Sequence, residues 1–374
     1  MCDIVILIFE TLFYRMEIKT IRPLIIGDII AKLPIVQGGM GIGVSLSRLA
    51  SSVANAGGIG VLSAAGLGML YNKADSYEEN SIEGLRHEIR KTRVMTDGVL
   101  GVNIMVAMTN YSELVKVAIE ENIDVIFAGA GLALDLPKYL SQDSPTKIVP
   151  IISSGRAAKV LIKKWLQNYD YLPDAFVLEG PLAGGHLGFS KEQIDSPDYV
   201  LEKLLVNVLQ TIKPFEEKHN KTIPIIVGGG IYTGQDIKKF LTLGASGVQM
   251  ATRFVTTHAC DAEEAFKQMY INARKEDIII VDSPVGLPGR AIQNQYLKDV
   301  KAGLKKPFTC PYDCIITCKK EAAPYCITLA LLNAKNGKLH NGFAFAGSNA
   351  YRAKEIISVK TLISTLKKEY NESS

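Results

Sequence analysis

Eight short apolar runs, separated by longer segments of helical periodicity, constrain the fold of this chain more than any other feature. Each run is apolar almost throughout instead of alternating with polar residues, which is typical of parallel strands buried on both faces. We therefore expect strands at residues 33–37, 58–63, 99–106, 124–129, 147–153, 174–180, 222–230 and 246–252.

The segments between these runs predict helices with recognisable ends. Ser154 is placed as an N-cap before an apolar stripe that includes Trp165. Thr233 and Asp236 form a capping-box pattern, and Gly244 follows where a C-terminal cap belongs. Eight strand–helix units of this length predict an α/β fold, the (β/α)8 TIM barrel. A doubly wound open sheet is the alternative, but the chain lacks the G-x-G-x-x-G pattern of a Rossmann domain.

Charge and hydropathy exclude several classes of protein. The chain has 42 Lys and Arg against 38 Asp and Glu, a net charge of +4, and it has no basic block, so we expect no nucleic-acid partner. The apolar run from Ile4 to Phe9 is too short to span a bilayer and lacks the flanks of a signal peptide. Six cysteines are few for a secreted disulfide scaffold. We therefore expect a soluble, cytoplasmic protein with no membrane partner.

Glycine-rich loops follow four of the predicted strands. QGGMGIG follows the first, EGPLAGGHLG the sixth, GGGI the seventh, and QMATRF the eighth. The active site of a barrel lies at the carboxyl ends of its strands, and glycine is used where backbone turns sharply or approaches a ligand closely. These loops predict one rim that binds a large, flat ligand against backbone.

The last two of these loops predict a phosphate site. Barrels often bind phosphate between the seventh and eighth loops through backbone N–H groups, and here Gly228–Gly230 and Gln249–Thr252 occupy those positions. A tight turn with no ligand is the alternative for the three glycines. A phosphate site next to a long glycine-lined rim suits flavin mononucleotide (FMN).

Two polar residues predict contacts with such a ligand. Asn103, at the end of the third strand, can both donate and accept hydrogen bonds, as the isoalloxazine edge requires, or it can cap its own turn. His186, within the glycine loop of the sixth strand, can remove a proton α to an electron-withdrawing group or stabilise an anionic substrate. A loop histidine bonded to a nearby carbonyl is the alternative.

The motifs PIVQGGMG, GVNIMV, AGGHLG, PIIVGGGI and GVQMATRF, in this order, resemble the nitronate monooxygenase family, once called 2-nitropropane dioxygenases. The flavin-dependent enoyl-acyl carrier protein reductases share this fold and these motifs. SPVGLPGRAIQN (283–294) and residues 345–366 also resemble family segments. The resemblance covers roughly residues 20–300 and 343–370.

The resemblance implies a TIM barrel with non-covalent FMN and with His186 as the catalytic group. One departure is Glu179, where many relatives carry glutamine, because a carboxylate near the flavin disfavours a negative reduced ring unless it is paired or protonated. The FMN contacts implied by motif position are Gly39, Met40, Asn103, Glu179, Gly184, Gly230, Gln249, Met250, Ala251 and Thr252.

The function implied by the resemblance is an FMN enzyme that oxidises alkyl nitronates with dioxygen to carbonyl compounds and nitrite. The first alternative is an NAD(P)H-dependent FMN reductase of an enoyl thioester. The second is a flavin- or phosphate-binding barrel without catalysis. The expected partners are a small-molecule substrate and dioxygen, and a homodimer is left open.

We expect four regions along the chain. Residues 1–15 form an N-terminal extension that either belongs to the native protein or precedes its start, and residues 16–300 form the FMN-binding barrel. Residues 301–342 form a Cys-rich insertion, and residues 343–374 form a helical tail packed on the barrel. The insertion contains Cys310, Cys314, Cys318 and Cys326 in a C-x3-C-x3-C-x7-C pattern. Such thiols bind zinc or iron–sulfur clusters, or they stay free. The spacing is not a common zinc pattern, and we assign no metal.

Overall fold

The structure, a computed structural model, describes residues 21–71, 74–305, 310 and 312–372, so the predicted extension 1–15 lies outside the described residues. A strand forms within each of the eight predicted ranges, because these apolar runs are buried on both faces. The strands are β3 (Ile35–Gln37), β4 (Gly60–Ser63), β5 (Leu100–Met105), β6 (Val125–Gly129), β7 (Lys147–Ile152), β8 (Phe176–Glu179), β10 (Ile225–Gly228) and β11 (Gly247–Met250).

These eight strands form one parallel sheet that closes on itself. Their order is β3-β11-β10-β8-β7-β6-β5-β4, and every ladder between them is parallel. A parallel bridge between Val36 and Ile59 joins the first and last members, with the Gln37 N–H donating to the Ile59 carbonyl at 3.0 Å. The predicted (β/α)8 barrel is confirmed, and the doubly wound sheet is excluded.

Side chains fill the interior of the barrel and close its lower end. An antiparallel hairpin, β1 (Leu24–Ile26) and β2 (Ile29–Ala31), places Leu24 and Ile26 against the inward-facing residues. Burying these apolar side chains removes them from water and stabilises the fold, and it leaves only the upper end for a ligand. The inward-facing residues that the hairpin covers include Val36, Val61, Val125, Phe127, Val149, Val177 and Ile226.

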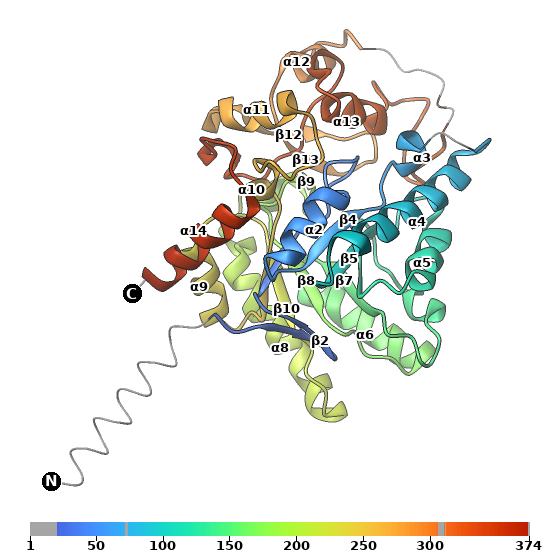
Figure 1. Ribbon diagram of the computed structural model, residues 1–374, viewed down its shortest axis with the longest axis vertical. Coiled ribbons are helices and arrows are strands. Elements are labelled where there is room, and N and C mark those ends of the chain that lie inside the picture. Colours follow the sequence, from blue (N-terminus) through green and yellow to red (C-terminus); the bar gives the residue numbers. More distant parts are fainter. Residues whose placement is uncertain (1–20, 72–73, 306–309, 311, 373–374) are drawn as a thin grey trace, which may run out of the picture.

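Helices surround the barrel (Figure 1). The predicted caps form: Ser154 Oγ accepts the Ala157 N–H, and Thr233 and Asp236 bond reciprocally. One expectation is wrong, because only a 3-10 turn, η1 (Leu136–Tyr139), connects β6 to β7, in a short segment that contains Pro137. The helices are α2 (Ser47–Asn55), α3 (Leu67–Leu70), α4 (Tyr77–Met95), α5 (Tyr111–Glu120), α6 (Gly155–Tyr169), α7 (Lys191–Ile194), α8 (Leu201–His219) and α9 (Gly234–Thr242).

The ring of helices is completed from the end of the chain. Helix α14 (Val359–Glu372) contacts both α9 and α2, and it buries Leu362 and Leu366. It therefore occupies the place between the seventh and first helices of the ring.

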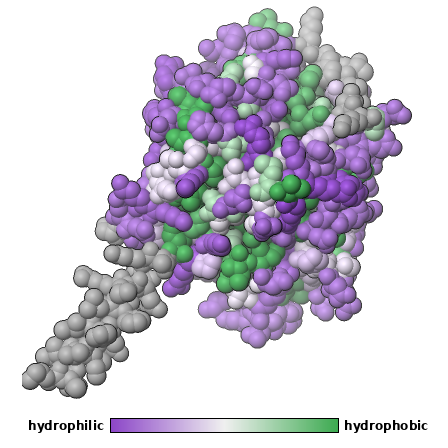
Figure 2. Space-filling model, viewed as in Figure 1, coloured by the Kyte–Doolittle hydropathy of each residue, from purple (hydrophilic) through white to green (hydrophobic). Residues whose placement is uncertain are grey.

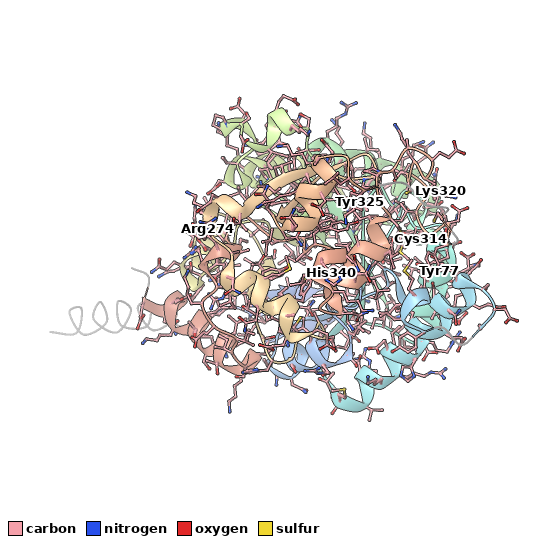
Figure 3. All side chains as sticks on the ribbon, turned by 90° about the horizontal axis from the view of Figure 1, so that it is seen from above. Tyr77, Arg274, Cys314, Lys320, Tyr325 and His340 are labelled. Carbon is pink, nitrogen blue, oxygen red and sulfur yellow. The ribbon has the colours of Figure 1, made fainter. Side chains whose placement is uncertain are left out.

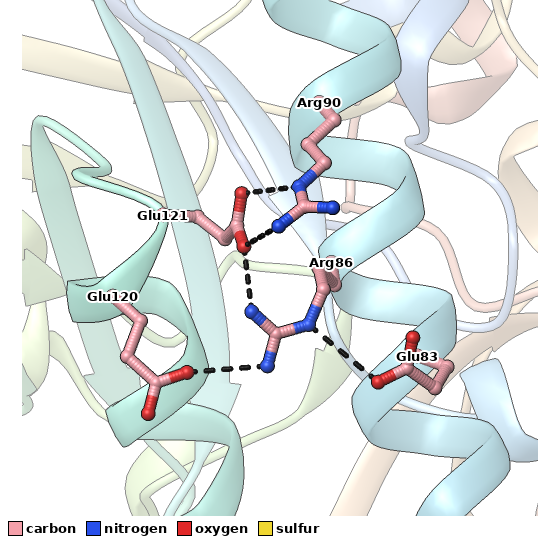
Figure 4. A network of polar contacts seen from close by, with 5 residues as sticks. All are labelled: Glu83, Arg86, Arg90, Glu120 and Glu121. Carbon is pink, nitrogen blue, oxygen red and sulfur yellow. Dashed lines mark hydrogen bonds and ion pairs between the residues drawn. The ribbon is translucent and has the colours of Figure 1, made fainter.

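An ion-pair network joins α4 to the end of α5 (Figure 4). The Glu121 carboxylate lies 2.6 Å from Arg86 Nη1 and 2.7 Å from Arg90 Nε, and Glu83 and Glu120 also pair with Arg86. The side chain of Glu121 is only 11% exposed, and the hydrogen bond from Arg90 leads the lowering of its pKa. The pairs between exposed groups contribute little, so the contacts of Glu121 carry most of the stabilisation.

A second layer covers the upper end of the barrel (Figure 1). It contains a three-stranded antiparallel sheet, β9 (Gly185–His186), β12 (Ile278–Asp282) and β13 (Pro288–Ile292), in the order β12-β13-β9. The helices of this layer are α10 (Thr252–Val255), α11 (Glu264–Asn272), α12 (Gln295–Lys301) and α13 (Ile327–Lys335).

The surface in Figure 2 is largely hydrophilic, with scattered hydrophobic patches. None of the helices in the described part of the chain has the length and apolar character needed to cross a membrane.

Candidate active site

The loop that carries His186 is held by the second layer. His186 pairs with Gly289 and Gly185 with Arg290, and Gly185 has a φ of +81°, which permits the turn into β9. The buried guanidinium of Arg290 donates through Nη1 to the carbonyls of Pro181 (2.5 Å) and Ala183 (2.7 Å). These bonds fix the glycine loop between β8 and β9, so His186 has a defined position above the barrel.

The imidazole of His186 is partly buried and bonded to a serine. Its Nε2 lies 2.7 Å from Ser283 Oγ, which also accepts the Val285 N–H at 3.4 Å. The Phe345 ring stands edge-on to the imidazole, with 5.0 Å between centroids. Burial lowers the pKa of His186 to about 4, so the ring is neutral at pH 7 and able to accept a proton. The side-chain partner of His186 is therefore a hydroxyl and not the carbonyl of the alternative interpretation.

Three polar side chains lie at the carboxyl ends of strands without hydrogen-bond partners among the described residues: Asn103 on β5, Glu179 on β8 and Gln249 on β11. The register places Gly228 between Glu179 and Gln249, so no side chain separates these two strand ends. Burial raises the pKa of Glu179 to about 7. Among the described residues, Asn103 makes no hydrogen bond that caps its own turn.

The loop after β3 packs directly on β5. A Cβ atom at Gly39 would lie 2.3 Å from the Asn103 Cβ, so only glycine allows this approach. The Met40 N–H is bonded to Ser45 Oγ at 2.8 Å, and its side chain packs on the core. The structure therefore brings Gly39 and Asn103 together, while Met40 offers no free N–H group.

The predicted phosphate loops lie side by side after β10 and β11. Gly229 and Gly230 have φ values of +100° and +84°. In the described part of the chain, no acceptor is paired with the backbone N–H groups of Gly230, Ala251 and Thr252. Unpaired N–H groups in neighbouring loops suit an anion.

A segment from the end of the chain covers these loops. The Gly347 N–H donates to Thr252 Oγ1 at 3.1 Å, and Asn349 Nδ2 donates to the Gly230 carbonyl at 2.6 Å. A Cβ atom at Gly184 would lie 2.5 Å from the backbone around residue 347, so the segment also touches the sixth loop. Gly184, Gly230 and Thr252 are therefore brought together under residues 345–349.

Met250 is the one predicted contact whose side chain points away from the site. It is 2% exposed and packs in the core between sheet and helices, so only its backbone faces the loops.

Sequence reasoning did not single out four residues that build this site. All four lie in residues 283–294 and 345–366, two segments that resemble the family. The resemblance indicated that these segments matter, but it did not indicate what any single residue in them does. The four residues are Ser283, Arg290, Phe345 and Asn349.

The residues present fit FMN. The free N–H groups of Gly230, Ala251 and Thr252 suit its phosphate, and the unpaired amides of Asn103 and Gln249 suit the polar edge of its ring. Two cavities elsewhere, of about 340 Å³ beside His87 on α4 and about 500 Å³ beside Met269 on α11, lie away from these loops.

Comparison with known proteins identifies the family of this chain. The profile of the nitronate monooxygenase family matches residues 23–369. The chain belongs to this family. Its members are flavoprotein oxidoreductases, and the family resemblance drawn from the motifs is therefore confirmed.

Relatives of this family member include two kinds of enzyme. A 5-hydroxy-7a-methyl-1-oxo-octahydro-1H-indene-4-carboxyl-CoA dehydrogenase of Mycobacterium tuberculosis is 27% identical over 72% of the chain and 66% of its own length. The chain thus spans just under two thirds of that relative. A probable nitronate monooxygenase of Staphylococcus aureus is 27% identical over 71% of the chain and 77% of its own length.

Solved structures share the fold of this chain. FabK from Thermotoga maritima is 27% identical, with a TM-score of 0.69, and covers 91% of this chain and 93% of its own. A nitroalkane oxidase from Streptomyces ansochromogenes, 21% identical with a TM-score of 0.70, covers 91% of this chain and 96% of its own and shows the fold alone. Membership of the family is therefore established, and the reaction and substrate of this chain are a separate question.

Proposed function

We propose that this chain is an FMN-dependent nitronate monooxygenase that oxidises alkyl nitronates with dioxygen to carbonyl compounds and nitrite. The observation that carries the proposal is the partly buried, neutral His186 bonded to Ser283 above the unpaired polar ends of the barrel strands. The family match and the Staphylococcus aureus relative support the same reaction.

The residues that fit FMN would hold its phosphate after β10 and β11 and its ring near Asn103 and Gln249. Bound FMN would accept electrons from the substrate and pass them to dioxygen. His186, neutral at pH 7, can take the proton α to a nitro group or donate a hydrogen bond to a nitronate oxygen. Ser283 fixes the orientation of the ring, and Phe345 shields it from water.

Glu179 is compatible with an anionic substrate because of its burial. With a pKa raised to about 7, the carboxyl is largely protonated below neutral pH and then does not repel a nitronate. Protonated, it can also donate a hydrogen bond.

The reduction of an enoyl thioester by NAD(P)H is the second candidate. The likeness to FabK and the two relatives named as carboxyl-CoA dehydrogenases favour a thioester substrate. In that reaction His186 would stabilise the developing enolate or supply its proton.

Anaerobic reduction separates the two candidates. The FMN-loaded protein is mixed with an alkyl nitronate, NADH or NADPH in separate cuvettes, and the flavin absorbance is followed. We expect nitronate to bleach the flavin or form the semiquinone, with no response to either nicotinamide. Rapid bleaching by NADH or NADPH, with none by nitronate, would establish the reductase instead. A protein that takes up no FMN would contradict both.

The role of His186 is tested in the same assay. We expect His186→Ala to retain FMN and to lower nitronate-dependent reduction roughly 100- to 10,000-fold. His219→Ala, on an exposed histidine at the end of α8, is the matched control and should react as the native protein does. Normal turnover of His186→Ala would show that the catalytic group lies elsewhere.

A further inference from the structure

Four of the six cysteines converge beside the barrel mouth. Cys314 and Cys318 pack in the same cluster as Tyr325 and Ile327, the two chain neighbours of Cys326. Cys310 interacts electrostatically with Cys314, Cys318 and Cys326. Cys318 also interacts electrostatically with Cys326, and Cys326 interacts in the same way with Cys314. Thiols separated by up to sixteen residues are therefore close enough in space to affect one another.

Direct contacts fix two members of this set at the start of α13. Cys326 is the N-cap, with its Sγ accepting the Leu329 N–H at 3.4 Å. Cys314 Sγ lies 3.3 Å from the hydroxyl of Thr328 in the same turn. The N-terminal end of a helix carries partial positive charge, so both sulfurs lie where a thiolate is stabilised.

The segment that carries Cys314 and Cys318 is tied to the loop after β5. The Thr109 N–H donates to the Cys314 carbonyl at 3.3 Å, and the Ile316 N–H donates to the Ala107 carbonyl at 2.9 Å. Ile315 forms an antiparallel bridge with Met108 between these bonds. The cysteines are therefore part of the fold next to the strand that carries Asn103.

Aromatic residues and a lysine surround the set. In Figure 3, Cys314 lies between Tyr77 and Lys320. The Tyr77 ring packs 5.8 Å from Tyr312, and Cys314 is 8% exposed within an apolar cluster. Lys320 interacts electrostatically with Cys310 and Cys318. Lys320 also pairs with Asp313, so the set is bordered by apolar and aromatic side chains on one side and by an ion pair on the other.

Four gathered thiols are a ligand set that structural zinc sites and iron–sulfur clusters use, and a bound metal deprotonates each coordinating thiol. Within the described residues, no three Cys, His, Asp or Glu side chains are placed to hold one metal ion. Thiols that interact at longer range suit a larger group, in which each thiolate binds a different iron.

We propose that Cys310, Cys314, Cys318 and Cys326 bind a four-iron iron–sulfur cluster. The cluster takes one thiolate at each iron, and the partial positive charge at the start of α13 lies beside the thiols of Cys314 and Cys326. This site is separate from the candidate active site and does not depend on the proposed reaction.

Metal analysis of the full-length chain tests the proposal. The protein is purified anaerobically and reconstituted with ferrous iron and sulfide, and iron, acid-labile sulfide, zinc and FMN are measured for each chain. We expect about four iron and about four sulfide. Mössbauer spectra and the paramagnetic resonance of the dithionite-reduced protein distinguish the cluster from the flavin. Stoichiometric zinc, four thiols free after reconstitution, or disulfides among them would overturn the proposal.

Serine substitutions connect the cluster to these residues. We expect Cys314→Ser and Cys326→Ser to lose at least half of the iron while retaining FMN. Cys260→Ser is the matched control, since Cys260 is buried in another cluster with its Sγ 3.5 Å from the Val44 carbonyl, and it should keep all the iron. Full iron in both test variants would refute the assignment. If a variant fails to fold, the native iron and sulfide content still decides.

Discussion

Replacement of Glu179 by glutamine tests the electrostatics of the barrel mouth. The carboxyl ends β8, has no hydrogen-bond or ion-pair partner among the described residues, and burial raises its pKa from 4.5 to about 7. Folding therefore favours the protonated form. At about 1.4 kcal/mol for each pKa unit, the difference between the two values amounts to about 3 kcal/mol.

The sign of this effect follows from proton linkage. Below pH 4.5 the carboxyl of Glu179 is protonated in both the folded and the unfolded chain, so it costs no stability. Between pH 4.5 and 7 only the unfolded chain loses the proton, and the free energy of unfolding falls as the pH rises. Glutamine has nearly the same shape and no charge. Glu179→Gln should therefore raise the free energy of unfolding by about 3 kcal/mol at pH 8 and leave it unchanged at pH 4.

Urea unfolding of the FMN-free protein at a series of pH values measures this difference. The dependence on urea concentration should be the same for both chains, because the surface exposed on unfolding does not change. Glu355→Gln is the matched control, since that carboxyl is exposed and without a partner among the described residues, and it should give no such pH-dependent gain. Equal stability of Glu179→Gln and the native chain at pH 8 would refute the reasoning.

Three further substitutions test other contacts. Ser283→Ala removes the hydrogen bond to His186, so it should lower nitronate turnover about tenfold and change the pH profile of turnover. Ser283→Thr keeps the hydroxyl and should restore both the rate and the profile. Steady-state kinetics at a series of pH values measures these effects. Gly39→Ala places a methyl group against Asn103, so we expect a loss of about 1–3 kcal/mol in urea unfolding and weaker FMN binding by fluorescence titration. Glu121→Gln should cost about 1 kcal/mol at low ionic strength and less in 1 M salt, and equal losses in both would contradict the ion-pair origin.

The barrel could be predicted from the sequence because its determinants are local. A run such as 147–153 is apolar throughout, so it can only be buried on both faces, and Ser154 marks the next helix through one side-chain bond. The hairpin of β1 and β2 was missed although its signal, Gly27 and Asp28 between two isoleucine pairs, was present.

The second layer could not be predicted in this way. β13 pairs with β9 across about a hundred residues, and nothing near Arg290 indicates that its guanidinium will bond the carbonyls of Pro181 and Ala183. The partner of His186 is likewise set by tertiary packing. A motif can identify the histidine, but only the fold brings Ser283 within 2.7 Å of it.

The end of the chain connects the two sites. Phe345 packs on His186, and Phe343 packs on both Phe345 and Tyr325, with ring centroids 5.0–5.9 Å apart along this path. Tyr325 directly precedes Cys326, so a continuous row of aromatic rings runs from the cysteine set to the imidazole. Packed interiors transmit displacement because they contain little free volume. An occupied cysteine site would therefore hold the start of α13 and, through these rings, the segment that covers the loops after β10 and β11.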